Sequence, residues 1–468
     1  SELYKHSSGL VAWSPDSTLL AVAVQHRLVI RDPRSMQILH VYTCLDAIND
    51  VKWSSDSAYV LATLYKRSTV QVWSIEKPEW TCRITEGLAG LVAARWAPDG
   101  RSVLTTADFA LHVTIWSLTD GSAVCIKNPK DAAFGRGAGT RGKNHGLDFS
   151  PDGLHLALAH RVDCRDTIGI YSTTNWARVT EFATGTVDLA DLSWSPDGSV
   201  ICVVDTELNY SIGIFSPDGK RLGRFSAYEN ALGVKSIAWS PTGKMLAIGS
   251  YDENGRILTH ISWTPIAELI HTASVSPEHA HVYCEVIVKG TGVDVETAYE
   301  LADAQARVKS VNPDSSKPNP QIGVGSISWS CDGEFIATKN DNMPHAVWIW
   351  SSKNLSLYAV LIHRNVVRSF SWCPRGRPSL AICTGINKVF FWAPQGASWV
   401  DIPSDDFDVR GMRWSPKGDT ILFLQSQQVC ACYFGETPSV SDSFEALQDV
   451  LRKQPEATTV NSVGDLEK

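Results

Sequence analysis

The chain has 468 residues, of which 44% are hydrophobic and 20% are charged, and its formal net charge at pH 7 is −8. This composition supplies enough apolar side chains for a large core and excludes general disorder. The acidic balance argues against a general nucleic-acid binder, whose contact surface needs an excess of Lys and Arg. We find neither an apolar stretch of roughly 20 residues nor a signal-peptide pattern. We therefore expect a soluble, intracellular protein.

Eleven cysteines occur, an odd number, and no two of them form a Cys-x-x-Cys pair. Disulfide frameworks and zinc sites need paired or closely spaced ligands, so we interpret these cysteines as reduced thiols. His279 and His281 would share one face of a strand, as would Cys430 and Cys432. Each pair lacks further ligands, so strand packing is the better interpretation. We predict no metal and no cofactor.

From Trp13 onward one phrase recurs along the chain. An aromatic residue is followed by small or polar residues and then by a turn rich in Pro, Asp and Gly. Most copies are spaced about 40 to 45 residues apart, the period of a four-stranded propeller blade. The nine copies are WSPDS at Trp13, WSSDS at Trp53, WAPDG at Trp96, FSPDG at Phe149, WSPDG at Trp194, WSPTG at Trp239, WSCDG at Trp329, WCPRG at Trp372 and WSPKG at Trp414.

Each of these nine anchors lies between strand-like runs. Apolar alternation precedes the anchor, as in VKSIAW (Val234–Trp239), and the Pro-Asp-Gly turn leads into a second run. Roughly twenty residues after the anchor a third run follows, such as VQVW ending at Trp73. The pattern predicts an all-β protein, a single β-propeller of nine blades, with seven or eight blades as the alternative. Most of the 17 Trp residues then belong to the core.

The two ends of the repeat region suggest how the ring closes. SELYKHSS precedes the first anchor, and the last repeat ends after VCACYF without an outer strand. We therefore expect the amino-terminal segment to supply the outer strand of the last blade. The predicted propeller covers residues 1–435, and the polar tail 436–468 is either flexible or contains a short partner-binding helix.

Two insertions interrupt the period, at about residues 127–145 and 275–321. The second contains HVYCEVIV and then VETAYELADAQARVK, which fits either a hairpin or a strand followed by a helix. The first contains GAGTRGKN, which differs from a phosphate-binding loop at Asn144. A strand and a hairpin turn follow it instead of the helix that such a loop requires. We predict a solvated basic loop or, alternatively, a contact with an acidic partner. Its basic residues are Lys127, Lys130, Arg136, Arg141 and Lys143.

No catalytic set stands out. The chain has no Gly-x-Ser-x-Gly elbow and no recognisable Ser, His and acid triad. We predict that the protein is not an enzyme.

The blade pattern also places a candidate binding surface. If the Pro-Asp-Gly turns share one face, the loops between second and third strands and between blades emerge on the other. Exposed aromatic and Arg residues in such loops often anchor interfaces. In the alternative interpretation, Asp side chains there only bond backbone groups in turns. The candidate partner-binding residues are Lys66, Arg67, Asp163, Arg165, Tyr228, Glu229, Tyr251, Asp252, Asn340, Asp341, Asn342 and His345.

Several phrases are more specific than the blade framework. They include QHRLVIRD at Gln25–Asp32, GVKSIAWSP ending at Pro241 and ATKNDNMPHAVWIW at Ala337–Trp350. Over about residues 4–434 the sequence resembles the WD-repeat protein eight family, the WRAP-type centrosomal WD-repeat proteins. The basic loop around Gly137 is longer than we expect in that family.

The resemblance implies a non-catalytic scaffold at the centrosome or the fungal spindle pole body. It implies a coiled-coil anchoring partner of the synovial-sarcoma-breakpoint-interacting type and, in fungi, a minus-end-directed kinesin, with the γ-tubulin complex as a further partner. Together these would hold microtubule minus ends at the pole, in the cytoplasm and cytoskeleton. The alternative is a propeller similar to a translation-initiation factor that binds ribosomal subunits. Neither function predicts a membrane or a specific nucleic acid as partner.

Overall fold

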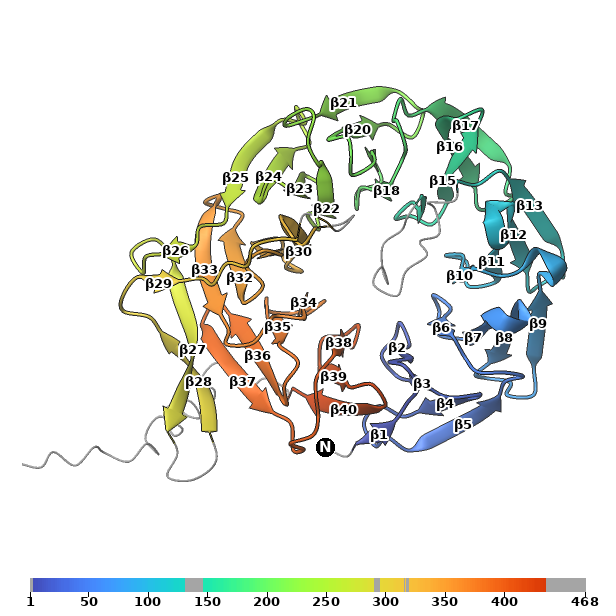
Figure 1. Ribbon diagram of the computed structural model, residues 1–468. Helices are drawn as coiled ribbons and strands as arrows, with labels where there is room; N and C mark the ends of the chain where they lie inside the picture. Colours follow the sequence, from blue (N-terminus) through green and yellow to red (C-terminus); the bar gives the residue numbers. More distant parts are fainter. Residues whose placement is uncertain (1–2, 131–145, 290–294, 315, 317–319, 435–468) are drawn as a thin grey trace, which may run out of the picture.

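The computed structural model describes residues 3–130, 146–289, 295–314, 316 and 320–434. These residues form β-strands and three short 3-10 helices, and the strands build nine blades arranged in a ring (Figure 1). The predicted nine-bladed β-propeller is therefore confirmed. No helix in this part of the chain is long and apolar enough to span a membrane.

The first six blades follow one another along the chain. Blade 1 is β2 (Val11–Trp13), β3 (Leu20–Val24), β4 (Arg27–Arg31) and β5 (Ile38–Thr43). Blade 2 is β6 (Asp50–Trp53), β7 (Tyr59–Leu64), β8 (Thr69–Ser74) and β9 (Thr81–Thr85). Blade 3 is β10 (Ala93–Trp96), β11 (Ser102–Thr106), β12 (His112–Ser117) and β13 (Ala123–Lys127). Blade 4 is β14 (Leu147–Phe149), β15 (His155–Val162), β16 (Arg165–Ser172) and β17 (Arg178–Ala183). Blade 5 is β18 (Asp191–Trp194), β19 (Ile201–Val204), β20 (Ile212–Phe215) and β21 (Arg221–Phe225), and blade 6 is β22 (Val234–Trp239), β23 (Met245–Ser250), β24 (Asn254–Thr259) and β25 (Pro265–Ile270).

The last three blades follow the second insertion. Blade 7 is β30 (Val324–Trp329), β31 (Phe335–Asn340), β32 (Ala346–Ser351) and β33 (Ser356–Ile362). Blade 8 is β34 (Ser369–Trp372), β35 (Leu380–Cys383), β36 (Lys388–Ala393) and β37 (Gly396–Asp401). Blade 9 is β38 (Gly411–Trp414), β39 (Thr420–Leu424) and β40 (Gln428–Tyr433), completed by β1 (Tyr4–Lys5).

The closure of the ring follows the sequence prediction. β1 pairs antiparallel with β40, with Tyr4 opposite Val429, so the start of the chain is the outer strand of blade 9. The His6 backbone N–H also donates to the Gln427 carbonyl at 2.8 Å. Residues from both ends of the chain therefore hold one blade together.

The repeated aromatic anchors explain how one blade is tied to the next. Each anchor ends the innermost strand of its blade, and most of the indole N–H groups donate to a backbone carbonyl of the preceding blade. This bond satisfies the polar end of a largely buried ring. The bonds are Trp13 to Arg413 (3.4 Å), Trp53 to Ala12 (3.0 Å), Trp96 to Lys52 (3.1 Å), Trp329 to Ala238 (3.0 Å), Trp372 to Ser328 (3.1 Å) and Trp414 to Ser371 (3.1 Å).

The Ser and Asp after the anchor form the turn itself. In blade 1 the Ser14 hydroxyl donates to Asp16 at 2.6 Å and accepts the backbone N–H of Leu19 at 2.9 Å. Ser14 is fully buried, so both of these bonds satisfy a group that water cannot reach. The same Ser-to-Asp bond recurs in blade 5, from Ser195 to Asp197 at 2.5 Å. These Asp residues stabilise the turns.

The second insertion forms a hairpin rather than a strand and a helix. β27 (His281–Lys289) pairs antiparallel with β28 (Val295–Leu301), and β27 also pairs parallel with β33 at the outer edge of blade 7 (Figure 1). A small sheet of β26 (Ser274–Val275) and β29 (Ala306–Arg307) closes its base. The apolar run HVYCEVIV is therefore a strand, and the segment read as a possible helix begins with one.

A buried polar cluster holds this hairpin to the ring. The Glu285 carboxylate accepts the backbone N–H of Arg364 at 2.9 Å, and Tyr299 hydrogen-bonds to His363 at 3.1 Å. Burial lowers the pKa of His363 to about 3, so the ring is neutral. Tyr299 also packs against Phe390 of blade 8, with ring centroids 5.1 Å apart. The hairpin is thus part of the fold and joins two blades.

The core consists of apolar clusters between neighbouring blades, and Trp348 and Trp392 are among its largest fully buried side chains. All eleven cysteines are free thiols, and Cys202, Cys383 and Cys430 are buried among these clusters. Burial raises the pKa of the Cys202 thiol, which keeps it protonated and unreactive.

Candidate functional site

The ring has two chemically different faces, and its topology places all twelve predicted residues on one of them. The loop between first and second strands lies at one end of every antiparallel blade, and the loops between second and third strands and between blades lie at the other. We call the first the turn face and the second the loop face. All twelve residues lie in or beside loops of the second kind.

On the loop face, blades 5, 6 and 7 bring six of these twelve residues into one polar network. Lys235 forms a salt bridge with Asp341 at 2.7 Å, and its ammonium lies 4.8 Å from the centre of the Tyr251 ring. The ammonium also donates to the Ile322 carbonyl at 2.8 Å. The side chains of Lys235 and Asp341 are only 10% and 15% exposed. The two charged side chains therefore bind each other in a largely buried position.

A second part of the network surrounds Arg256. Its guanidinium donates to Asp252 at 2.6 Å and lies 6.0 Å from the centre of the Tyr228 ring. The Tyr228 hydroxyl donates to the Leu232 carbonyl at 2.6 Å, and burial raises its pKa to about 12. Tyr228 and Asp252, predicted as interface residues, thus bind groups of their own chain.

The third part of the network links blades 6 and 7 through Glu253. Its carboxylate accepts the side-chain amides of Asn342 at 2.7 Å and of Asn340 at 3.4 Å. Asn340 is fully buried, and Asn342 and Tyr251 are each 5% exposed. The expectation that these three side chains are exposed for a partner is therefore wrong, because carboxylates and cations of adjacent loops enclose them.

Beneath Glu253 a chain of hydrogen bonds continues into blade 7. The Trp350 indole donates to Thr338 at 2.8 Å, and the Thr338 hydroxyl donates to Nε2 of His271 at 2.8 Å. The Nδ1–H of His271 donates to the Glu253 carbonyl at 3.0 Å. Burial lowers the pKa of His271 to about 4, so the ring is neutral at pH 7.

The remaining predicted residues are spread over the loop face. Asp163 and Arg165 are exposed at the hairpin tip of blade 4, where Asp163 and Cys164 have φ of 50° and 59°. Asp tolerates this left-handed conformation, which a two-residue hairpin turn requires. Glu229 is exposed and His345 is half-buried. The structure therefore does not join these residues to the network of blades 5, 6 and 7.

The basic loop is only partly as predicted. Lys127 is exposed at the end of β13, but Lys130 is 3% exposed, and its ammonium lies 2.9 Å from Asp166 and 2.7 Å from Asp188. The prediction of a solvated side chain is wrong for Lys130. Its ammonium links β16 of blade 4 to the segment between β17 and β18, which leads into blade 5. Arg136, Arg141 and Lys143, with the GAGTRGKN motif, lie outside the described residues.

The sequence interpretation missed a group of exposed apolar side chains on blades 2 and 3. The 3-10 helices η1 (Tyr65–Arg67), η2 (Gly87–Ala89) and η3 (Asp108–Ala110) all lie on the loop face. Leu88 is fully exposed, Phe109 is 75% exposed, Leu111 is 56% exposed and Tyr65 is 36% exposed. We call these four residues the apolar patch. A signal was present, since Leu88 and Phe109 stand in short segments between predicted strands, where polar residues are the rule.

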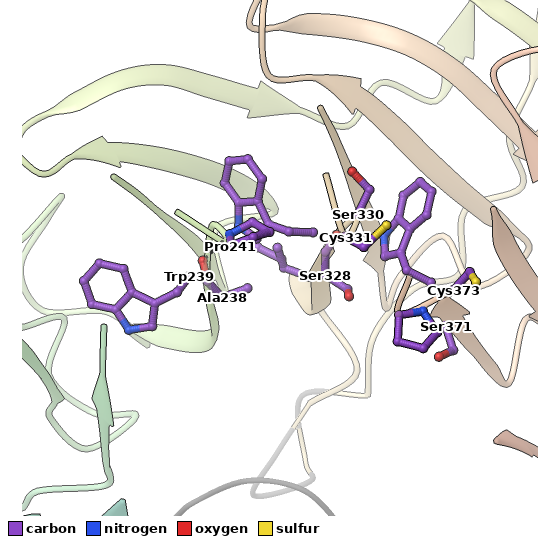
Figure 2. A pocket seen from close by; sticks show the side chains of 12 residues that line it. Ala238, Trp239, Pro241, Ser328, Ser330, Cys331, Ser371 and Cys373 are labelled. Carbon is purple, nitrogen blue, oxygen red and sulfur yellow. Dashed lines mark hydrogen bonds between the residues drawn. The ribbon is translucent and has the colours of Figure 1, made fainter. Parts of the chain in front are cut away.

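The turn face carries a cavity of about 470 Å³ between blades 6, 7 and 8 (Figure 2). Its walls are the anchors Trp239, Trp329 and Trp372 with adjoining Ser, Pro and Cys residues. Burial raises the pKa of the Cys331 and Cys373 thiols, and no lining residue is acidic, basic or a histidine. Among the described residues no cluster of His, Cys, Asp and Glu is placed to hold a metal ion. This cavity therefore offers no acid, base or activated nucleophile.

Comparisons with known proteins identify the repeats of this propeller as WD repeats. Residues 219–257 match the model of the WD domain, G-beta repeat. The chain is 42% identical over 463 residues to WD repeat-containing protein WRAP73 of Mus musculus, which covers 95% of this chain and 98% of that protein. It is 24% identical over 351 residues to an uncharacterized WD repeat-containing protein of Schizosaccharomyces pombe, covering 69% of this chain and 66% of that protein.

Among solved structures, the C-terminal WD40 domain of Sif2 is similar with a TM-score of 0.49 and 14% identity, covering 86% of this chain and 98% of that chain. The similarity to WRAP73 extends over nearly the whole chain. The chain belongs to the WRAP73 family of WD-repeat propeller proteins, a protein-interaction scaffold fold.

Proposed function

We propose that this propeller is a non-catalytic scaffold that binds a coiled-coil partner through its loop face and helps to anchor microtubule minus ends at the centrosome or spindle pole body. The observation that carries the proposal is the 42% identity to WRAP73 across 95% of the chain, together with the centrosomal family phrases such as NDNMP. The loop face supports it, because large apolar side chains exposed together are typical of interaction surfaces.

The proposed partners are a coiled-coil anchoring protein of the synovial-sarcoma-breakpoint-interacting type, a minus-end-directed kinesin in fungi and the γ-tubulin complex. In this function the propeller contributes a rigid surface and no chemistry. The rigid network of blades 5, 6 and 7 suits this role, since a preformed surface loses little conformational entropy when it binds.

The test is purification of the tagged full-length protein from its native cells, identification of associated proteins by mass spectrometry, and reconstitution with the recombinant partner. We expect the coiled-coil anchor to co-purify with the protein and to bind it directly at micromolar or lower concentration. Fluorescence microscopy of the tagged protein is expected to show it at the microtubule organising centre in mitosis.

Association with ribosomal subunits in place of these proteins would contradict the proposal and favour the translation-factor alternative. A uniform cytoplasmic distribution in mitosis, combined with no direct binding of the coiled-coil anchor, would also contradict it.

A further inference from the structure

The cavity of about 470 Å³ on the turn face lies between blades 6, 7 and 8, and we call it the turn-face cavity (Figure 2). Its volume is within the range of about 300–1,000 Å³ that is usual for binding pockets. Three indole rings, two prolines, Ala238 and Ile327 line it, and its other lining residues are Ser and Cys. No lining residue carries a charge, so the cavity suits apolar side chains rather than ionised ones.

The described chain leaves the ring beside this cavity. β40 of blade 9 ends on the turn face, and the Phe434 ring that follows it stacks on Trp414, with ring centroids 5.3 Å apart. The Phe434 N–H donates to the Asp419 carbonyl at 2.9 Å. The carbonyl of the adjacent Gly418 lies 3.6 Å from Sγ of Cys373, which lines the cavity. The segment after Phe434 therefore begins next to the wall of the turn-face cavity.

The sequence after Phe434 contains a helical pattern. We call the stretch SFEALQDVLRKQ, residues 443–454, the tail segment. Phe444, Leu447 and Leu451 stand at i, i+3 and i+7 in it, a spacing that places them on one face of a helix. A proline follows the segment directly, as is common after a helix. The tail segment therefore carries an apolar stripe that the described part of the chain leaves without a partner.

The linker between the ring and the tail segment is short. It consists of residues 435–442, and these eight residues span up to about 28 Å when extended. A flexible tether of this length keeps its end at a roughly millimolar effective concentration around the attachment point. At micromolar protein concentration the tail segment therefore reaches the cavity of its own chain ahead of the same segment of a second copy.

The turns beside the cavity are basic on blades 8 and 9. Arg375 and Arg377 are exposed in the turn between the first two strands of blade 8, and Lys417 is exposed in the equivalent turn of blade 9. The one acid in these two turns, Asp419, accepts the Ser415 hydroxyl at 2.6 Å. Positive charge therefore predominates where the chain leaves the ring.

The charges on the other two blades are mixed. On blade 7 Asp332 accepts the Ser330 hydroxyl at 2.5 Å, and Lys353 forms a salt bridge with Glu334 at 2.5 Å. On blade 6 Lys244 is exposed in the turn after the anchor. These blades therefore add no excess of negative charge around the cavity.

The tail has the complementary charge. From Glu436 to Asp449 it contains four acidic residues and no Lys or Arg, and Arg452 and Lys453 come only at the end of the tail segment. Opposite charges favour the approach of two surfaces and fix their orientation. The acidic first half of the tail segment is therefore attracted to the turns of blades 8 and 9.

We propose that the tail segment binds in the turn-face cavity of its own chain as one amphipathic helix, with the Phe444, Leu447 and Leu451 side chains against the cavity walls. The point where the chain leaves the ring, the uncharged lining and the opposite charges together favour this occupant. This inference goes beyond the proposed function, which uses the loop face, and the two can fail separately. The ring then has one face for a partner and another that is closed by its own chain.

The first test is photo-crosslinking within the full-length protein. The photoreactive residue benzoylphenylalanine replaces Phe444, and mass spectrometry maps the crosslinked peptides. We expect them to contain residues 238–241, 327–331 or 371–374. The matched control places the same probe at Val460, in the tail but outside the tail segment, and we expect it to give at least about tenfold fewer of these crosslinks. Crosslinks mainly to the loop face, or equal yields from the two probe positions, would overturn the assignment.

Mixing protein labelled with ¹⁵N and unlabelled protein before crosslinking shows whose tail is bound. We expect both peptides of each crosslink to carry the same label, because the tether favours the tail segment of the same chain. Crosslinks that combine labelled with unlabelled peptides would assign the cavity to the tail of a second copy and would overturn the intramolecular contact.

The second test is amide hydrogen exchange of the full-length protein. A free helix of this length is marginal in water, so slow exchange in the tail segment reports docking. We expect its amides to exchange at least about tenfold faster in Phe444→Asp, Leu447→Asp, because charged side chains do not enter an uncharged cavity. The matched control Val460→Asp, Val463→Asp is expected to leave the exchange unchanged. Equal exchange in the wild type and in the first variant would contradict the proposal.

The ring side of the contact is tested in the same way. Arg375→Glu, Arg377→Glu is expected to speed exchange in the tail segment by about three- to tenfold at low salt and by less at high salt. Lys220→Glu, Arg221→Glu is the matched control, since these two residues are exposed at the turn face of blade 5. Thermal melting establishes that the variants are folded. An equal effect of the two pairs, or none from the first, would rule out docking beside blade 8.

Discussion

Blades 6 and 7 and blades 2 and 3 present opposite kinds of surface on the same loop face. In blades 6 and 7 the charged and amide side chains bind one another, as Lys235 binds Asp341 and Asn342 binds Glu253. In blades 2 and 3 the exposed side chains are apolar, with Leu88 fully exposed and Phe109 75% exposed. Polar residues that look functional in the sequence are therefore structural in one sector, and apolar residues that look ordinary are exposed in the other.

Beneath these two surfaces, the same framework position is satisfied by different side chains. In blade 7 the Thr338 and Trp350 pair is capped by a buried neutral histidine, His271, which directly follows the last strand of blade 6. In blade 3 the corresponding Thr105 and Trp116 pair bonds to the carboxylate of Glu86. Both arrangements satisfy buried polar groups, so both stabilise their blade. The difference between the two surfaces arises above them, in the loops.

The largest expected effect comes from breaking the polar network. Lys235→Met removes the salt bridge to Asp341 and the bond to Ile322, and it leaves a mostly buried carboxylate without its cation. We expect the free energy of unfolding to fall by about 3 kcal/mol. The matched control Lys66→Met, in the other sector, is expected to change it by less than about 0.5 kcal/mol. Urea denaturation followed by Trp fluorescence measures both, and similar losses in the two variants would remove the distinction between the sectors.

A smaller effect is expected from pH. The pKa of His271 is lowered to about 4 by burial, so between pH 6.5 and 4 the unfolded chain binds a proton that the folded protein does not. Stability is therefore full above about pH 6.5 and is lost as the pH falls. Through His271 the free energy of unfolding is expected to decrease by about 2 kcal/mol from pH 7 to pH 5. In the variant His271→Gln we expect the free energy of unfolding to decrease by about 2 kcal/mol less between pH 7 and pH 5 than in the wild type. Denaturation curves at pH 5, 6 and 7 measure this decrease. The same decrease in the variant and the wild type would refute the role of His271.

The smallest expected effect has opposite signs for stability and binding. Phe109→Gly relieves the left-handed conformation at φ 56°, and the lost ring is exposed, so we expect the protein to become more stable by about 0.5 kcal/mol. The same change is expected to weaken binding of the coiled-coil anchor. Thermal melting and calorimetry measure the two effects. A destabilisation above about 1 kcal/mol would mean that the ring packs within the fold.

Much of the fold could be predicted because it is encoded locally. Each anchor, its Ser and Asp turn and its third strand occur within one repeat, so Trp53 or Trp372 identifies its blade without knowledge of the neighbours. Closure by Tyr4 and Lys5 could be predicted as well, since the last repeat lacks a strand. The hairpin Tyr283–Leu301 stayed ambiguous, because a short apolar run does not distinguish a strand from a helix until its partner is known.

The sequence by itself determined a β-propeller and favoured nine blades over seven or eight, and it indicated how the ring closes, because these follow from short-range alternation, turn residues and a fixed period. Only the tertiary structure decided which loop residues face solvent. Asn340, Tyr251 and Lys130 are buried because their partners Glu253, Lys235 and Asp166 come from other strands or other blades. Tyr65, Leu88 and Phe109 are exposed together for the same kind of reason, since only the packing of blade 2 on blade 3 brings their three turns side by side.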